Sequence, residues 1–524
     1  VTNTTGSYNT ATGNGALYYN TTGGYNTGVG VSALRLNTTG SKNVAVGNNA
    51  LDANTTGTRN IAFGYRALDV SDDESDNLAI GYDALGGSID GGEYNVAIGN
   101  YSLDANTTGD YNVAVGYNSL TGNTTGNYVT AIGGKALQAN TTGTGNTAVG
   151  TNAMESNTTG ASNTVMGWNA LVTNTTGSNN LAMGVNTMFY NTTGYKNVAL
   201  GDYGLWANTE GMENVAISGN GSLYKNTTGS QNIAIGAASL YNNETGNYNI
   251  AIGRSSLYSN TASNNVGIGH ESLKSNTTGT DNVGVGYKAL NATTTGKDNA
   301  ALGREALMSN TTGDFNIAIG SGAMDATAGN NQTGVVAIGG NALGGLTSGT
   351  SNVAVGYQAA DSVTTGAGNT IVGHQSLSTA NGAAENNTTL GHQAMISASS
   401  STTTGNIAIG PSALTGGSGA LTGCIAIGHA SLDSTGSNAH TGTIAIGHSA
   451  LTALTSGAGN TAVGYQAGDN LDGGHRNTLL GYQALSAEDG HGYNVAVGWK
   501  SLLAQNAGAN AANVVAISIG SVPL

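Results

Sequence analysis

The stretch from Asn37 to Ala53, NTTGSKNVAVGNNALDA, decides how this chain folds, because similar 17-residue stretches surround it. Asn20 to Leu36 reads NTTGGYNTGVGVSALRL, and Asn3 to Tyr19 reads NTTGSYNTATGNGALYY. Each copy carries an Asn, a triplet that is typically apolar, small, apolar, then a Gly, and a Leu or Met four residues after that Gly. We call the glycine after the triplet the coil glycine and align the repeats on it. A fixed short period of this kind is typical of solenoid proteins, in which each repeat forms one coil.

The period extends along the whole chain of 524 residues and gives about 30 repeats. Spacing stays at 17 through most of the first 320 residues and then loosens, as between Gly320 and Gly339. We therefore divide the chain into a regular region, residues 1–320, and a looser region, residues 321–524, with coils of 18 to 20 residues and loop insertions. In the looser region Ser, Ala and Gly-rich links, such as residues 399–405, replace the NTTG turn.

Each repeat predicts a very short β-strand, because about three residues have strand character before Gly ends the run. The 85 glycines make helices implausible. We expect the strand to be followed by a turn, a second short extended piece carrying Leu, and the NTTG turn. Stacked repeats would form an all-β parallel β-solenoid, a rod on the order of 140 Å long at a strand spacing of roughly 4.8 Å.

Both sides of the triplet are apolar, which bears on assembly. Val or Ile points to one side of the strand, and Ala or Gly points to the other. One of these two apolar sides would line a narrow interior, and the other would need a further surface to cover it. Three chains packed about a common axis would bury both, and we predict a homotrimer. A monomer with an apolar outer wall and an uncapped filament are the alternatives.

Composition excludes several classes of function. Fourteen Lys and Arg against 29 Asp and Glu give a net charge of −15, which disfavours nucleic-acid binding. No apolar stretch is long enough to span a membrane. The single Cys424 excludes an intrachain disulfide and a Cys-based zinc site. The chain begins at Val1 instead of Met, which suggests a processed or partial product.

Two motifs resemble a known family. NVAIGNYS at Asn95 to Ser102 and NIAIG at Asn249 to Gly253 are similar to the head repeats of trimeric autotransporter adhesins, the YadA-like left-handed parallel β-roll. The resemblance implies a trimeric, non-enzymatic, extracellular fibre head that adheres to surfaces. This chain usually lacks the family's Ser between Asn and Val, and its coil is longer, so the family's collagen contact is not carried over. Similar repeats also resemble those of bacteriophage tail fibres.

We therefore expect a non-enzymatic structural fibre, extracellular or on the cell surface, that adheres to a surface or host cell. A bacteriophage tail-fibre shaft or receptor-binding protein on a virion is one alternative, and a self-assembling surface filament or ice-binding solenoid is another. The expected partners are further copies of the chain, with glycans, matrix proteins or a host surface. No catalytic, cofactor or metal residues are expected. A hexapeptide-repeat acyltransferase is disfavoured because its coil needs an aliphatic residue at every sixth position.

The position directly after the coil glycine, here called the outer ring position, often carries an aromatic ring or His. We expect these side chains to stack along one wall, and the flat Tyr and Trp faces make that wall the predicted binding surface. A His ladder there suits a metal, an anion or a response to mild acid, but no carboxylate recurs beside it to orient the rings, so a solvated wall is favoured. The predicted surface residues are Tyr65, Tyr82, Tyr117, Trp168, Tyr287, Tyr357, His392, His429, His448, Tyr465, Tyr482 and Trp499.

The NTTG turn, present in 13 literal copies, also contains a glycosylation sequon. Copies on neighbouring coils are too close for a glycan on each, so we predict a ladder of hydrogen-bonded Asn side chains instead. Adjacent Thr residues such as Thr38 and Thr39 would face opposite sides, which disfavours ice binding. The acidic run Asp72, Asp73, Glu74 and Asp76 is confined to one repeat and predicts a solvated loop, with a local cation site as the alternative.

Overall fold

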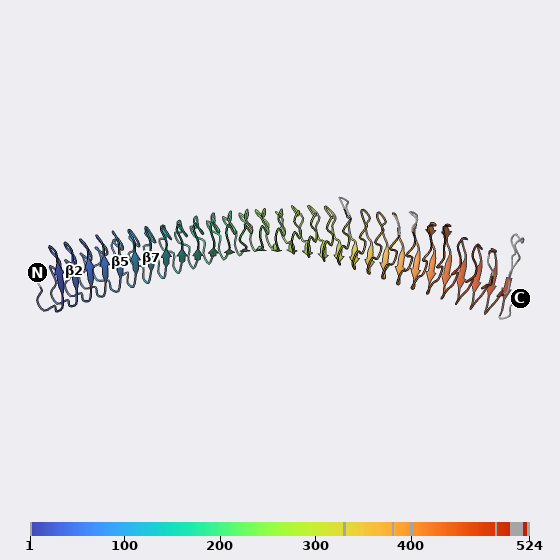
Figure 1. The fold of residues 1–524 in the computed structure, drawn as a ribbon, viewed down its shortest axis with the longest axis horizontal. Coiled ribbons are helices and arrows are strands. Elements are labelled where there is room, and N and C mark those ends of the chain that lie inside the picture. The colour runs from blue at the N-terminus through green and yellow to red at the C-terminus, as the bar shows by residue number, and fades with distance from the viewer. Residues whose placement is uncertain are drawn as a thin grey trace. The chain divides into compact units, whose positions relative to one another are not determined.

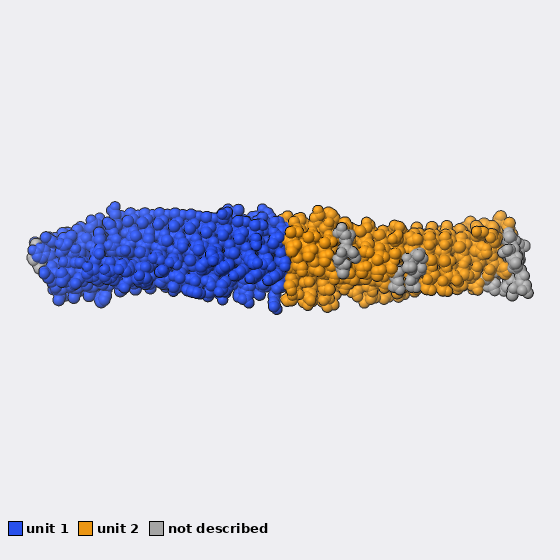
Figure 2. Space-filling view, turned by 90° about the horizontal axis from the view of Figure 1, so that it is seen from above, with its two compact units in different colours: residues 1–263 blue, residues 264–524 orange. Residues whose placement is uncertain are grey.

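A computed structural model of the chain describes residues 3–327, 332–379, 382–398, 403–487, 490–503 and 517–520. Within these ranges all regular secondary structure is β, and no helix is present. The chain divides into two compact units, Val1–Ser263 and Asn264–Leu524 (Figure 2). Each unit is a parallel β-solenoid with one short strand per coil (Figure 1), which confirms the predicted fold class. The predicted boundary at residue 320 remains a prediction, and four residues of the 399–405 link lie outside the described ranges.

The strands of the first unit each contain three residues and begin three residues before the coil glycine, whose place Ser218 takes after Val215–Ile217. They are β1 (Thr10–Thr12), β2 (Thr27–Val29), β3 (Val44–Val46), β4 (Ile61–Phe63), β5 (Leu78–Ile80), β6 (Val96–Ile98), β7 (Val113–Val115), β8 (Thr130–Ile132), β9 (Thr147–Val149), β10 (Thr164–Met166), β11 (Leu181–Met183), β12 (Val198–Leu200), β13 (Val215–Ile217), β14 (Ile233–Ile235) and β15 (Ile250–Ile252). Within the unit, each strand pairs in parallel with the strand of the next coil, triplet over triplet, as in Val44↔Ile61.

The second unit repeats this pattern and adds a two-stranded sheet, β25 with β27. Its strands are β16 (Val266–Ile268), β17 (Val283–Val285), β18 (Ala300–Leu302), β19 (Ile317–Ile319), β20 (Val336–Ile338), β21 (Val353–Val355), β22 (Thr370–Val372), β23 (Thr388–Leu390), β24 (Ile407–Ile409), β25 (Leu421–Thr422), β26 (Ile425–Ile427), β27 (His440–Thr441), β28 (Ile444–Ile446), β29 (Thr461–Val463), β30 (Thr478–Leu480), β31 (Val495–Val497) and β32 (Ile517–Ile519). The extra pair joins Leu421 to His440 in longer coils.

The middle residue of nearly every triplet, most often Ala or Gly, faces the interior. Ala45 and Ala114 have no exposed surface, whereas the flanking Val44 and Val46 are half-buried and point outward. Ala or Gly fills this position in most coils, and Val165, Ile371 and Leu479 are also buried there. The apolar outer side predicted from the triplet is therefore present.

The Leu of each coil lies in a turn, so the predicted second extended piece is wrong. Leu51 has φ +50° and is fully buried, and most coils place Leu or Met in the same left-handed conformation. The chain must reverse direction within a few residues of the strand, and a left-handed residue makes that reversal where an extended residue would not. The cost of the strained backbone is offset by burial of the side chain and by the hydrogen bond from Leu51 N to Ala67 O of the next coil, 3.0 Å.

Two Asn ladders run through the interior, which confirms the prediction that the NTTG Asn side chains bond along the stack. In the first ladder Asn37 Nδ2 donates to Asn20 Oδ1 (2.7 Å) and to Gly40 O (3.0 Å). In the second, the Asn before the triplet accepts from the next coil, as Asn43 N donates to Asn26 Oδ1 (2.9 Å). Buried amides are satisfied in this way coil after coil, which fixes the register of the stack.

Glycine fits the NTTG turn best because neighbouring coils approach closely there, although Glu74 stands at this position in one coil. A Cβ on Gly40 would come within 3.0 Å of the Asn37 side chain and of Gly57 O. No real Cβ tolerates such contacts, so the coil would have to move. The glycine therefore sets the spacing at which the Asn ladder can form.

Candidate functional site

The outer side of the triplets is an apolar surface in each unit. Ile61 and Phe63 of β4 are 44% and 55% exposed, and Leu302 of β18 is 51% exposed. The same two positions of each coil carry Val, Ile, Leu or Met in most strands, so apolar side chains follow one another at the strand spacing. We call this surface the outer triplet face.

Every predicted binding residue at the outer ring position is exposed at the surface. In the first unit Tyr65 stacks on Tyr82 with ring centroids 5.3 Å apart, whereas Tyr117 meets Tyr101 edge-on and Trp168 has no recorded ring contact among the described residues. In the second unit His270 stacks on Tyr287 at 5.7 Å.

Two longer columns in the second unit contain four of the eight histidines. The first runs through Tyr357, His374 and His392, with neighbouring centroids 5.4 and 5.2 Å apart. The second runs through His429, His448, Tyr465 and Tyr482, with centroids 5.0, 5.2 and 5.2 Å apart, and confirms the predicted stacking of His429 on His448. Pro411 occupies the coil between His392 and His429 and separates the columns.

Stacking changes what these rings can offer to a ligand. Parallel rings at 5.0 to 5.4 Å cover one another's faces, so a column presents ring edges, phenol hydroxyls and imidazole nitrogens to solvent. The flat faces on which the sequence prediction relied are open only at the end of a column or on an unstacked ring. Trp499, 53% exposed, holds Lys500 Nζ 4.8 Å from its ring centroid.

Ring columns also occur at two positions that the sequence analysis missed. Tyr94, Tyr111 and Tyr128 stack five residues before the coil glycine, with centroids 4.8 and 5.4 Å apart. A second column lies five or six residues after the coil glycine position, with centroids 4.9 to 5.2 Å apart. It contains Trp206, Tyr224, Tyr241 and Tyr258. Searching every position of the 17-residue period for aromatic residues, instead of one, would have found both columns.

The NTTG residues offer little to a ligand. The ladder Asn residues, such as Asn140, are fully buried, so their side-chain nitrogens lie inside the coil and not where a glycan could be attached. The first Thr is also engaged, as Thr38 Oγ1 donates to Thr55 O at 3.0 Å, and the second, such as Thr39, is exposed. One exposed Thr per coil is fewer than the paired rows of an ice-binding face.

Cys424 is a structural residue. It replaces the Asn that precedes the triplet, and its backbone N donates to Asn406 Oδ1 at 2.9 Å. It is fully buried, and burial raises the pKa of the Cys424 thiol. A buried thiol of raised pKa is a poor nucleophile.

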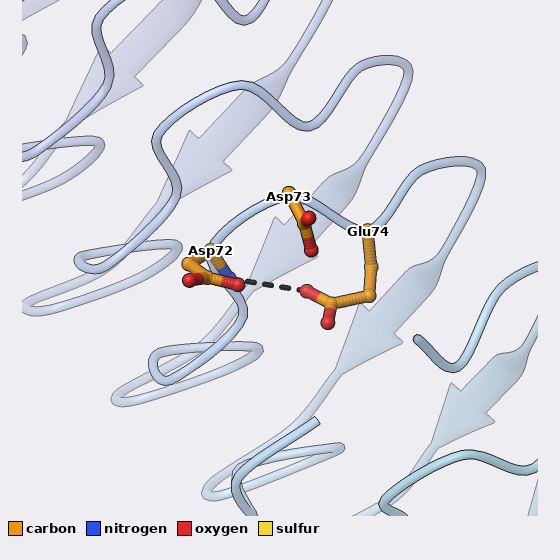
Figure 3. A group of neighbouring side chains, drawn as sticks. All are labelled: Asp72, Asp73 and Glu74. Carbon is orange, nitrogen blue, oxygen red and sulfur yellow. Dashed lines mark hydrogen bonds between the residues drawn. The ribbon is translucent and has the colours of Figure 1, made fainter. Parts of the chain in front are cut away.

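The acidic run does not form an open cation site. Asp72, Asp73 and Glu74 carry carboxylate oxygens within 4.8 Å of one another (Figure 3). Glu74 takes the place of the NTTG glycine and is buried; its carboxylate accepts from Ser71 Oγ (2.7 Å), Asp72 N (3.1 Å) and Gly91 N (2.9 Å). The Glu74 carboxylate is thus already committed to the loop backbone. The neighbouring Glu74 charge is the main cause that raises the pKa of Asp73.

No protein-family model matches the chain, and no curated protein is similar to it. A search of the described residues for long apolar helices that could cross a membrane also finds none.

Proposed function

We propose that the chain is a structural fibre protein that acts outside the cell or on a virion and adheres to a surface without catalysis. The observation that carries the proposal is the outer triplet face, which is apolar in coil after coil of both units. Soluble monomers rarely expose contiguous apolar patches above a few hundred Å². Further copies of the chain would cover this face, and we propose a homotrimer.

The ring columns support the adhesive part of the proposal. Exposed Tyr, Trp and His side chains recur at coil positions outside the triplet. Tyr presents a large contact area and a hydroxyl at low entropic cost. An ice-binding solenoid is less well supported, because the NTTG turn exposes one Thr per coil.

The solution mass tests the assembly. The monomer is 51.8 kDa, and light scattering is expected to give three times that value. The double variant Ile61→Ser, Phe63→Ser and similar pairs on neighbouring coils should dissociate the trimer, whereas Tyr128→Ser, on an exposed ring away from the triplet, should not. A monomeric wild-type chain would contradict the proposal.

Attachment to surfaces tests the function. Changing Tyr465 and Tyr482 to Ser should reduce attachment of the intact chain to cells or glycan-coated surfaces, with the solution mass unchanged. Unchanged attachment would exclude this column as the adhesive surface.

A further inference from the structure

A hollow of about 420 Å³ opens on the surface of the first unit. Its volume lies in the range of small-molecule binding sites. Its lining includes Asn220, Tyr224 and Tyr241, with Tyr203 in the first of the coils concerned and Arg254 in the last. None of these residues was singled out by the sequence analysis.

The hollow exists because two successive coils lack large side chains where other coils carry them. At the outer ring position and the residue after it, these coils present Asn220 with Gly221, and Ala237 with Ala238. Ala238 N donates to Asn220 O (3.0 Å) as Asn49 N donates to Val31 O (2.9 Å) in regular coils, so Asn220 is equivalent to Ala237. Gly219 is therefore an insertion that makes the coil one residue longer. The corresponding positions elsewhere often carry Tyr, Trp, His, Lys or Arg.

The aromatic lining offers both an open ring and a row of polar edges. Tyr224 and Tyr241 stack on one another at 5.0 Å, so their edges and hydroxyls are what the column can present to the hollow. Tyr203 is tilted by 49° to Tyr224 at 6.4 Å and belongs to no parallel stack among the described rings. Its face is therefore available for an apolar contact.

Arg254 supplies a cation that no other described residue neutralises. Arg35 and Arg59 each form a two-point ion pair with an Asp, whereas Arg254 forms no ion pair within the described part of the chain. A smaller hollow of about 300 Å³ near Tyr18 also contains an arginine, but there Arg35 is bound to Asp52 at 2.8 Å. An unpaired guanidinium in a chain of net charge −15 is suited to bind an external anion in a bidentate manner.

The length of the hollow indicates an extended ligand. Tyr203 and Arg254 belong to coils three steps apart, which is roughly 14 Å at the ordinary strand spacing. The lining combines an apolar floor of Gly and Ala with hydroxyl and amide groups. A sugar has this same combination, since a pyranose ring carries apolar C–H faces and hydroxyl edges.

We propose that this hollow binds an anionic oligosaccharide of about two or three sugars. One sugar packs against the Tyr203 ring, the middle of the chain lies over Ala237 and Ala238 beside the Tyr224 and Tyr241 hydroxyls, and an acidic group pairs with Arg254. The inference deepens the proposed adhesive function by naming a ligand class. It does not depend on the trimer, because every lining residue belongs to one chain.

Calorimetry on the intact chain tests the site with trigalacturonate, a sulfated trisaccharide, neutral maltotriose and triglutamate as probes. At least one anionic trisaccharide is expected to bind, and the two anionic probes distinguish a carboxylate from a sulfate. Arg254→Gln should weaken that binding about 10-fold or more. Ala237→Tyr should abolish it, because it fills the hollow with the residue that other coils carry at this position.

The matched control is Arg304→Gln, which removes an arginine from the same coil position outside the hollow and should leave binding unchanged. Three results would overturn the inference. Neither anionic sugar binds, maltotriose or triglutamate binds as tightly as the anionic sugars, or the Ala237→Tyr variant binds as tightly as the wild-type chain. The solution mass of the same sample tests the trimer separately. A monomer that binds the sugar would reject the proposed assembly and retain this site.

Discussion

The two units fill one buried position in different ways. Seven residues after the coil glycine, most coils of the first unit carry the ladder Asn, as in the unbroken run from Asn106 to Asn243. Among the described coils of the second unit, five carry an apolar residue at this position, and all are fully buried: Leu346, Val363, Ala398, Leu454 and Leu471.

The backbone is the same in both cases. Asn140 N donates to Leu137 O at 3.1 Å, and Leu454 N donates to Leu451 O at 3.3 Å. The coil therefore accepts either an amide or an aliphatic side chain at this position, provided that the neighbouring coils carry the same kind of side chain there. An amide beside an aliphatic residue would lose its partner, and an unpaired buried amide is costly.

Replacing a ladder Asn by Leu in the first unit, or a buried Leu by Asn in the second, should have the largest effect. Asn140→Leu would leave Asn123 Oδ1 without its donor and one N–H of Asn157 without its acceptor, and it should destabilise the first unit by about 4 kcal/mol. Leu454→Asn should cost the second unit about 3 kcal/mol, because Leu471 on the next coil cannot pair with an amide. Hydrogen exchange of the flanking coils measures both losses.

The control for the Asn140→Leu substitution is Asn242→Leu, at a half-buried position outside the ladder in the first unit. It should change stability by less than about 0.5 kcal/mol. If Asn140→Leu cost no more than this control, the ladder would not be what stabilises the first unit.

Glycines of the two units should also respond differently to Ala. Gly160→Ala places a Cβ within 3.0 Å of Gly177 O and of the Asn157 side chain, and it should cost the first unit about 3 kcal/mol. Gly442 in the second unit has open space around it and φ +62°, so Gly442→Ala should cost about 1 kcal/mol from backbone strain alone. Equal losses in local hydrogen exchange would show that close approach of the coils is not the dominant constraint.

Acidification should favour the second unit over the first. Burial raises the pKa of several Asp residues, so these residues bind a proton more readily in the folded chain than in the unfolded chain. Their contribution to stability therefore increases as the pH falls toward 3.8, the pKa of Asp in the unfolded chain. Ion pairs lower the pKa of Asp76, Glu213 and Glu271, whose contribution is instead lost on acidification. The raised group is Asp69, Asp104, Asp325, Asp361, Asp433 and Asp469.

Four of these six Asp residues lie in the second unit, whereas two of the three ion-paired carboxylates lie in the first. Partial exposure screens these charges, so the change should be modest. Hydrogen exchange at about pH 4.5 and pH 7, corrected for the intrinsic rate, should show a larger gain in the second unit. A relative loss there would contradict the assignment.

The strands and the Asn ladder could be predicted from the sequence because both repeat with the coil. A triplet such as Val44 to Val46 indicates its own strand, and an Asn repeated at one position of each coil can bond to its own copies. The left-handed Leu could not be predicted in the same way, because Leu has no intrinsic preference for that conformation. The path of the chain around a narrow coil imposes it.

The hollow at Tyr203 and Arg254 could not be predicted from the repeat, because it arises where the repeat is interrupted. Small residues at Ala237 and Ala238 become informative only after Gly219 is recognised as an insertion that aligns Asn220 with the outer ring position. The 17-residue period predicts the scaffold, and departures from it predict where a ligand has room.

The smallest effect is expected at Thr293, where a single substitution would make the second unit resemble the first. Thr293 occupies the ladder position between Asn276 and Asn310, and its hydroxyl is buried without a hydrogen-bond partner. Thr293→Asn would provide an acceptor for Asn310 Nδ2 and recreate the NTTG turn, raising stability by about 1 kcal/mol. Thr293→Val removes the buried hydroxyl without extending the ladder and should give a smaller gain. Denaturant unfolding measures the stability of both variants. If Thr293→Val is more stable than Thr293→Asn, the gain comes from removing an unpaired polar group and not from a continuous ladder.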